Sequence, residues 1–344
     1  MRPGPLAIIA REQGIESHEF STSHRYRDLP TVVRGIHWLI KLAKNSQAAL
    51  FHSTHTAHLY ASPAAKWLGV PEVWHHHDRP SPGFDLVQTV NRRLPTTHAI
   101  FTTKAVAAAY PWLTRRPHSV IAPVCVDPAA LAAHRDAADV RERLGIPPGD
   151  LLLTVARLQE HKGHSDLLDA AAVVLASHPG AVFGIVGKAS TPEQTAYLAS
   201  LREQATRLGI ADRVVFTGFV SDADLASLYR RAIAMVHPAR SEGYGLVLLE
   251  AMGMGLPVIA AAADGPRELL IDDTNGLLTP VADALALAVA VRRLLSDAGL
   301  RDRLKTGGRS TATDLAANDM LRQTTDVFQH LRRQTMHGFR DRSD

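Results

Sequence analysis

Short apolar runs alternate with longer alanine- and leucine-rich segments along most of the chain, and this alternation restricts the fold more than any other feature. Segments such as DLLLTVARL and AVFGIVG have the length and the β-branched content of buried strands, whereas HSDLLDAAAVVLASHP is typical of a helix. Strands that alternate regularly with helices are characteristic of parallel βαβ units. The pattern stops in the polar, proline-containing region 127–150 and then starts again. We therefore predict two doubly wound α/β domains.

The expected elements follow from this alternation. In the first half, strands are predicted at 48–53, 70–78, 98–103 and 118–124, and helices at 31–45, 56–69 and 104–113. In the second half, strands are predicted at 150–158, 181–187, 213–220, 233–239 and 257–262, and helices at 164–179, 192–209, 222–232, from 246, 282–297 and 315–334. In folds of this kind, ligands bind outside the carboxyl ends of the strands.

Composition narrows the class of protein. The 344 residues are 46% hydrophobic, and 38 Lys and Arg oppose 34 Asp and Glu, so the net charge of +4 is too small to indicate a nucleic-acid-binding protein. The single Cys125 excludes an internal disulfide and a cysteine-based zinc module. We see no apolar signal-peptide core and no uncharged apolar stretch of about 18 residues, so we expect a soluble cytoplasmic protein.

The segment RSEGYGLVLLEAMGMGLPVIA, residues 240–260, places two carboxylates at one helix start. Glycines before a helix let the backbone approach a ligand closely, and the N–H groups of the first turn favour an anion such as a diphosphate. Glu242 precedes this start and Glu250 lies one to two turns further on, so both are placed to bind hydroxyls beside a diphosphate. Alternatively, Glu242 only caps the helix and Glu250 is solvated. Four apolar residues precede Glu250, however, which is a poor setting for an unpaired charge.

A second segment, VARLQEHKG at residues 155–163, supplies two cations. A predicted strand ends near Arg157, and Lys162 lies in the loop before the next helix. Arginine binds phosphate in bidentate fashion and lysine binds it as a point charge. Alone, the two side chains are better explained as solvated surface cations. Together with the glutamate segment they favour diphosphate binding.

Three consecutive histidines, His75, His76 and His77, end a predicted strand in the first half. Consecutive strand residues point to opposite faces of a sheet, so these three cannot easily ligate one metal ion. We expect one histidine that hydrogen-bonds a substrate rather than a zinc site.

The sequence Asp222 to Asp224 has the D-x-D form that holds a divalent metal in some nucleotide-sugar enzymes. Here it follows TGFVS and opens a predicted helix, where Ser221 or Asp222 is suited to the N-cap and acidic residues favour the first turn. We interpret the motif as helix capping.

Taken together, these segments resemble the retaining GT-B glycosyltransferases of family 4, the glycosyl transferases group 1. Glu242 and Glu250 match the Glu-x7-Glu motif of that family, and VARLQEHKG is similar to its donor-phosphate loop. VVFTGFVSDADLASLYRRA resembles the strand and helix of the base pocket, and DGPRELLIDDTNGLLTP resembles the block that follows. The similarity extends from about Pro71 to the carboxyl terminus and is most specific within 151–280.

The resemblance implies two Rossmann-like domains whose parallel sheets face each other across a cleft. Residues 1–126 would bind the acceptor, residues 127–310 would bind the nucleotide sugar, and a helix within 311–344 would return to the first domain. The implied chemistry uses no metal and no cofactor, with the nucleotide sugar as a co-substrate.

The resemblance also implies roles for single residues. His77 would hydrogen-bond the donor sugar near its reacting carbon, Arg157 and Lys162 would hold the diphosphate, and Glu242 would contact the donor sugar. The implied donor-binding positions are Gly187, Val220, Gly243, Tyr244, Gly245, Leu246 and, at the ribose, Glu250.

The implied reaction moves a sugar from a UDP- or GDP-sugar to a glycan, a lipid-linked or a small-molecule acceptor, as in the synthesis of cell-envelope polysaccharides. Retention without a protein nucleophile suggests attack on the same face that the leaving phosphate departs from. Two alternatives stay open. One is a catalytically impaired subunit that only binds nucleotide sugars, and the other is a different GT-B enzyme such as a sugar-nucleotide epimerase.

Two further expectations concern the first domain. The start MRPGPLAIIAREQG resembles the end of the family's first helix and its second strand, so we expect the first strand and the glycine-rich loop to be missing or shortened. Alternatively, LAIIA is itself the first strand. Arginines 92, 93, 115 and 116 would give this domain a basic face for peripheral contact with the inner face of a membrane.

Overall fold

The computed structural model describes residues 13–18, 20, 29–80, 86–123, 138–316 and 320–340. They divide into two units. The first holds the described residues up to Phe101, Ala107–Val120 and those from Thr324 on; the second holds Thr102–Val106 and those from Ile121 to Gln323. Residues 1–12, where the first strand and the glycine-rich loop were expected to be missing or shortened, and the predicted domain boundary at 126 lie outside the described residues.

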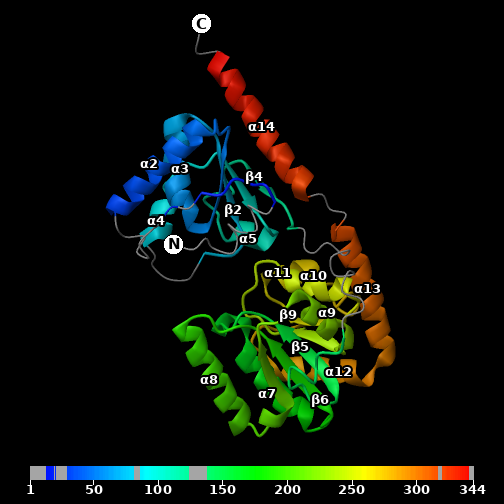
Figure 1. Ribbon diagram of the computed structural model, residues 1–344. Helices are drawn as coiled ribbons and strands as arrows, with labels where there is room; N and C mark the ends of the chain where they lie inside the picture. The colour runs from blue at the N-terminus through cyan, green and yellow to red at the C-terminus, as the bar shows by residue number, and fades with distance from the viewer. Residues whose placement is uncertain are drawn as a thin grey trace. The chain divides into compact units, whose positions relative to one another are not determined.

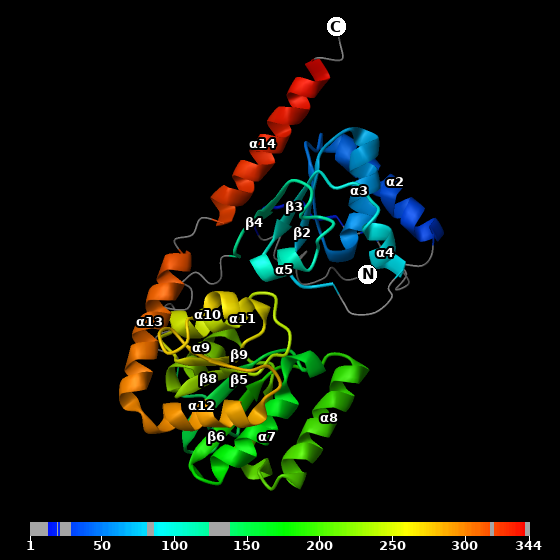
Figure 2. The same ribbon diagram turned by 180° about the vertical axis from the view of Figure 1, so that it is seen from behind.

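The first unit is built on a parallel sheet whose described strands run in the order β1-β2-β3-β4 (Figure 1). Its strands are β1 (Phe51–Thr54), β2 (Glu72–His76), β3 (His98–Phe101) and β4 (His118–Val120). The intervening elements are α2 (Leu29–Asn45), η1 (His55–Ala57), α3 (His58–Leu68), α4 (Leu86–Asn91) and α5 (Lys104–Ala108). Helices α2 and α3 pack side by side, as both ribbon views show (Figures 1 and 2).

The helix predicted at 104–113 is wrong in its second half, because α5 ends at Ala108. Pro111 explains the early end. A proline has no backbone N–H to donate within the helix, and its ring disfavours the helical conformation at the preceding residue, Tyr110.

The second unit contains a longer parallel sheet in the order β10-β9-β8-β5-β6-β7. Its strands are β5 (Asp150–Val155), β6 (Ala181–Val186), β7 (Val214–Gly218), β8 (Ala234–His237), β9 (Val258–Ala261) and β10 (Leu277–Thr279). Its helices are η2 (Glu160–Lys162), α7 (His164–Leu175), α8 (Pro192–Arg207), η3 (Ala211–Arg213), α9 (Asp222–Arg231), α10 (Leu246–Gly253), α11 (Asp264–Leu269), α12 (Ala284–Ser296) and α13 (Ala298–Ala316).

Two apolar cores cover the two faces of this sheet, because successive strand residues point to opposite sides. On β5, Leu152 packs into the core formed with α7 and α12, whereas Leu151 and Leu153 pack into the core formed with α9 and α10. Figure 2 shows these helix pairs on opposite sides of the sheet. Burial on both faces explains why the strands read as continuous apolar runs.

The sequence pattern missed α13 and located α14 (Met320–Arg340) only in part. Helix α13 contains adjacent glycines at 307 and 308, and both are there for contact rather than flexibility. A Cβ at Gly307 would lie 2.1 Å from the carbonyl oxygen of Thr274, and Gly308 lies against Met252 of α10. From Thr324 on, α14 belongs to the first unit, where the ring of Phe328 lies 5.3 Å from that of His52. The predicted return of the final helix to the first domain is confirmed.

Within the ranges described, we find no helix both long and apolar enough to cross a bilayer.

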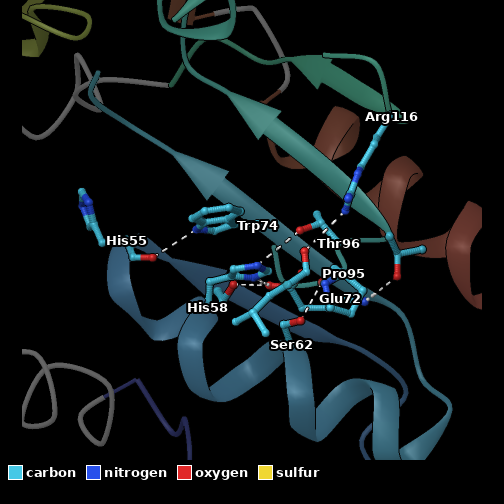
Figure 3. Close-up of polar contacts among 11 residues, drawn as sticks. His55, His58, Ser62, Glu72, Trp74, Pro95, Thr96 and Arg116 are labelled. Carbon is cyan, nitrogen blue, oxygen red and sulfur yellow. Dashed lines mark hydrogen bonds and ion pairs between the residues drawn. The ribbon is translucent and has the colours of Figure 1, made fainter. Parts of the chain in front are cut away.

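A buried carboxylate holds β1, β2 and α3 together in the first unit (Figure 3). Glu72 is only 2% exposed, and its Oε1 accepts hydrogen bonds from the Ser53 hydroxyl and from His58, whose Nδ1 lies 2.9 Å away. The His58 ring stacks on Trp74 with the ring centres 3.9 Å apart. Because a buried charge without partners is expensive, this carboxylate depends on His58 and Ser53.

We predict that His58→Phe lowers the free energy of unfolding by about 3 kcal/mol, because it leaves the Glu72 charge buried without its strongest partner. The phenyl ring can keep the stacking on Trp74, so the loss isolates the polar contact. Adding Glu72→Leu should recover most of the stability. Chemical denaturation gives the free energy of unfolding of wild type, the single variant and the double variant. A double variant that is even less stable than His58→Phe would contradict this account.

Candidate functional site

The order of strands in the second unit locates a ligand site. The chain proceeds from β5 through β6 to β7 on one side, and then returns to place β8 on the other side of β5. Such a reversal separates the loops that follow the two central strands and leaves a crevice at their carboxyl ends. The loop after β5 carries Arg157 and Lys162, and the loop after β8 carries Glu242. These predicted site residues therefore share one edge of one sheet.

Backbone contacts fix the two loops against each other. The N–H groups of Arg240 and Ser241 donate to the carbonyl of His161 at 2.8 and 3.3 Å. Gly163 has a φ of +71°, and a Cβ there would lie 2.0 Å from the carbonyl oxygen of Pro238. Only glycine permits both this conformation and this approach. Arg240 also forms a bidentate ion pair with Asp166 of α7, with distances of 2.6 and 2.8 Å.

Lys162 and Glu242 form a direct ion pair between these loops. Lys162 Nζ lies 3.0 Å from Glu242 Oε2, and the two side chains are 11% and 15% exposed. Both were predicted to contact the donor, and the structure brings them together. A cation already held in place needs little reorganisation when an anionic group enters.

His237, the last residue of β8, is a further member of this cluster that the sequence reasoning did not identify. Its Nε2 lies 2.9 Å from the same Glu242 oxygen, and the ring is 1% exposed. Burial alone would raise the pKa of the Glu242 carboxyl. The hydrogen bond and charge of His237, together with Lys162, outweigh burial and lower this pKa to about 2. The sequence feature that could have identified His237 is a polar residue at the end of an otherwise apolar strand.

The predicted glycines lie at the start of α10. Gly245 is its N-cap with a φ of +97°, and Gly243 and Tyr244 are buried beside it. The carbonyl of Glu242 accepts a hydrogen bond from Gly265 at 3.0 Å, and a Cβ at Gly265 would clash with the Tyr244 backbone. The start of α11 therefore packs directly against the turn at residues 242–245 and holds it in place. Leu246, the first helical residue, is exposed.

Glu250 lies further along α10 and has a different environment from Glu242. Its Oε2 accepts a hydrogen bond at 3.1 Å from the hydroxyl of Tyr229, which is itself 1% exposed on α9. The Glu250 carboxylate therefore has a hydrogen-bond partner within the protein. Its role toward a ribose stays a prediction.

Arg157, Gly187 and Val220 line one pocket of about 530 Å³ beyond the ends of β5, β6 and β7. Lys188 and Phe219 line it too, and the Phe219 side chain is 76% exposed. Packing alone explains why residue 187 is a glycine, since a Cβ there would lie 2.1 Å from the carbonyl oxygen of Ala156. The pocket has the size of a small-molecule site, but Lys162 and Glu242 are not among its lining residues.

His77 lies in the first unit and follows β2. The alternation expected for the three histidines is confirmed, because the rings of His75 and His77 stack 4.3 Å apart while His76 packs against Tyr110. Burial, reinforced by neighbouring imidazoles, lowers the pKa of His75 and His76 to about 3, so both are neutral at neutral pH. Among the residues that the structure describes, no three His, Cys, Asp or Glu side chains are arranged to hold a metal ion.

The D-x-D motif caps a helix, as predicted. Ser221 is the N-cap of α9, and its hydroxyl accepts a hydrogen bond from the backbone N–H of Asp224 at 3.2 Å. The Asp224 carboxylate pairs with Arg143 at 2.5 Å, so it already has a cationic partner.

Two parallel α/β units, with cations and carboxylates at the switch point of the second, define a GT-B protein, and solved structures agree. The Anabaena protein Alr3699/HepE in complex with UDP and glucose superposes with a TM-score of 0.77 at 23% identity, covering 96% of this chain and 89% of that one. A glycosyltransferase from Rickettsia africae gives a TM-score of 0.78 at 16% identity, covering 96% and 88%. At these identities the likeness shows the fold alone.

The sequence itself matches the profile described as glycosyl transferases group 1 over residues 136–311, and the chain belongs to that family. It is 40% identical over 182 residues to a D-inositol 3-phosphate glycosyltransferase from Acidothermus cellulolyticus, covering 50% of this chain and 39% of the relative. It is 33% identical over 167 residues to an alpha-D-kanosaminyltransferase from Streptomyces kanamyceticus, covering 48% and 42%. The matches thus span less than half the length of these relatives.

The lowered pKa of Glu242 predicts an acid-dependent stability difference. A folded-state pKa near 2, against an ordinary value of 4.5, stabilises the fold above about pH 4.5, and this contribution is lost as the pH falls toward 2. Glu242→Gln should therefore be less stable than wild type by up to about 3 kcal/mol at pH 7, with the gap narrowing below pH 4.5. Urea denaturation of both proteins at several pH values measures this difference in the free energy of unfolding. The exposed Glu203→Gln is the control, and a gap independent of pH would contradict the assignment.

The contact of Gly163 with Pro238 gives a second prediction with an internal control. Gly209 has nearly the same φ, +70° against +71°, but has nothing within 4 Å of a built Cβ. Gly209→Ala should cost only backbone strain, about 1 kcal/mol, whereas Gly163→Ala should cost more because it pushes the two loops apart. Thermal unfolding compares the two variants; equal losses would show that the close approach is unimportant.

Proposed function

We propose that this protein is a retaining glycosyltransferase that uses a UDP- or GDP-sugar and needs no metal ion. The observation that carries the proposal is the Lys162–Glu242–His237 cluster at the switch point, next to the pocket that contains Arg157. A diphosphate is the ligand that such cations suit, and the sugar hydroxyls suit the carboxylate. Named relatives that transfer sugars, and the UDP complex of the Anabaena protein, support the class of donor.

In the proposed reaction, the bond between the anomeric carbon and the diphosphate oxygen breaks, and its electron pair stays with the diphosphate. The acceptor oxygen bonds to the same carbon on the same face, and its proton passes to the departing phosphate oxygen. Arg157 and Lys162 stabilise the charge that grows on the diphosphate, which is the work a metal does elsewhere. Ser221 caps α9 at this motif and the Asp224 carboxylate pairs with Arg143, which supports metal independence.

The remaining residues are proposed to bind and orient the donor. Glu242 contacts the sugar, and entry of the diphosphate exchanges one partner of Lys162 for another. The start of α10 at residues 243–246 faces the diphosphate with backbone N–H groups, and Glu250 binds the ribose. Gly187 and Val220 line the part of the pocket proposed for the nucleoside, and His77 contacts the sugar from the first unit.

The proposal includes three classes of acceptor: a glycan, a lipid-linked acceptor and a small molecule. Peripheral contact with an anionic membrane likewise stays a proposal. Arginines 92, 93 and 115 are exposed in the first unit, as such contact requires. Arg116 is half-buried and donates to the carbonyl of Leu94 at 3.4 Å (Figure 3).

The test is release of UDP or GDP from UDP-glucose and GDP-mannose, with and without EDTA. We expect slow release from one donor that EDTA does not reduce. Tight binding of a donor without any release would favour the alternative of a nucleotide-sugar-binding subunit. Interconversion of the donor sugar without nucleotide release would favour an epimerase.

Lys162→Ala should lower kcat by about 100-fold while changing donor affinity by less than about tenfold, because the extra charge on the diphosphate exists only in the transition state. Lys305→Ala removes a partly exposed lysine of α13 and is the matched control. Steady-state kinetics and donor titration by calorimetry separate the two effects. Near-normal turnover of Lys162→Ala would refute the assigned role.

A further inference from the structure

His237 is a polar side chain at the end of an apolar strand. Strand β8 lies between β9 and β5, and the residues that precede His237 in it, Ala234 to Val236, are fully buried. The His237 ring is itself 1% exposed, and its Nδ1 is buried with no hydrogen-bond partner in the part of the chain that the structure describes. Such an atom costs free energy. An apolar side chain would fill this position without that cost, so folding alone does not explain a histidine here.

The contact with Glu242 is the one hydrogen bond that the His237 ring makes to the described residues. Its Nε2 lies 2.9 Å from Glu242 Oε2. A carboxylate only accepts hydrogen bonds, so Nε2 carries a proton and is the donor. The polar character of His237 is therefore directed at a single oxygen of Glu242.

Both polar partners of the Glu242 side chain contact that same oxygen. Lys162 Nζ donates to Oε2 at 3.0 Å, beside the His237 contact. A carboxylate oxygen has two lone pairs, so these two donors occupy the acceptor sites of Oε2. No described residue donates to Oε1, and the Glu242 side chain keeps 15% of its surface exposed. The hydroxyl of a ligand is left with Oε1.

The two partners of Glu242 are held with different firmness. Lys162 ends the short helix η2 and reaches Glu242 over a flexible four-carbon stem. His237 belongs to a strand with neighbours on both sides, and it pairs with Ala260 of β9. In the proposed reaction Lys162 exchanges Glu242 for the diphosphate, whereas no part of the donor is proposed to bind His237. His237 is then the partner that keeps Glu242 in place.

We propose that His237 is a positioning residue of the donor-sugar site. It holds Glu242 Oε2, so that Oε1 stays directed at a hydroxyl of the donor sugar while the diphosphate engages Lys162. His237 does not itself touch the substrate. This proposal rests on the proposed function and deepens it, because it assigns the orientation of the sugar-binding carboxylate to a residue outside the Glu-x7-Glu motif.

The competing explanation is that His237 only stabilises the fold, by filling space and by giving the Glu242 charge a partner. The two explanations differ in the ligand whose binding they affect. A general loss of structure weakens binding of a nucleoside diphosphate and of its nucleotide sugar by the same factor. A loss of orientation at Glu242 weakens binding of the nucleotide sugar alone, because the nucleoside diphosphate carries no donor sugar.

The test is the sugar ratio, defined as the Kd of a nucleotide sugar divided by the Kd of its nucleoside diphosphate. Calorimetry on the full chain gives this ratio for UDP-glucose with UDP and for GDP-mannose with GDP. His237→Met removes the donor and fills the space with an adaptable apolar chain. We expect it to raise the sugar ratio about tenfold and to lower kcat for nucleotide release about tenfold.

His237→Gln is the matched rescue. Glutamine has the length of methionine but carries an amide N–H that can donate to Glu242 as Nε2 does. It should keep the sugar ratio and kcat within about threefold of wild type. Thermal unfolding without ligand gives the Tm of each variant, and the ratios are compared between variants that are folded at the temperature of the titration.

Two further variants locate the effect. In Glu242→Gln, adding His237→Met should change the sugar ratio no further, because His237 acts only through that carboxylate. Tyr229→Phe removes a buried donor from the other glutamate, Glu250, and is the comparison variant. It should leave the sugar ratio as in wild type.

The proposal is overturned if His237→Met keeps the wild-type sugar ratio, if it weakens both ligands by the same factor, or if His237→Gln behaves as His237→Met does. Each of these outcomes is compatible with nucleotide release by wild type, which would leave the proposed function standing. A raised sugar ratio without nucleotide release would leave the positioning role standing and refute the transferase. A wild-type protein that binds neither nucleotide sugar would refute both.

Discussion

The contact between the loops after β5 and β8 is the constraint on which the candidate donor site depends. It brings the Gly163 backbone against Pro238 and places Lys162 3.0 Å from Glu242. The ion pair contributes to stability, and it also fixes the positions of both side chains. It holds a cation and a carboxylate next to each other at the switch point of the sheet.

The two units place their polar groups in different ways. In the second unit, the Glu242 carboxylate has two partners and a lowered pKa, so its charge is maintained. In the first unit, burial lowers the pKa of His75 and of His76 to about 3. The second unit thus maintains the charge of a largely buried carboxylate, whereas the first keeps its buried imidazoles neutral.

Much of the architecture follows from local sequence. The alternation of apolar runs predicted the two parallel sheets, and the β5 and α7 segments begin at the expected residues because strong periodicity and a terminal glycine coincide there. Misplaced elements have physical causes. Helix α5 stops before Pro111, and α13 was hidden by its glycines, which serve close packing rather than a turn. Ser221 was recognisable as a cap because capping depends on a few neighbouring residues.

The sequence by itself determined the fold class and the short segments that carry the candidate donor-site residues, since strand and helix periods and the Glu242–Glu250 spacing are local properties. The tertiary structure alone decided which of these residues meet. It joined Lys162 to Glu242 across 80 positions and added His237 to the same carboxylate. Such contacts depend on strand order and on the packing of distant elements, and no local pattern in the sequence encodes either.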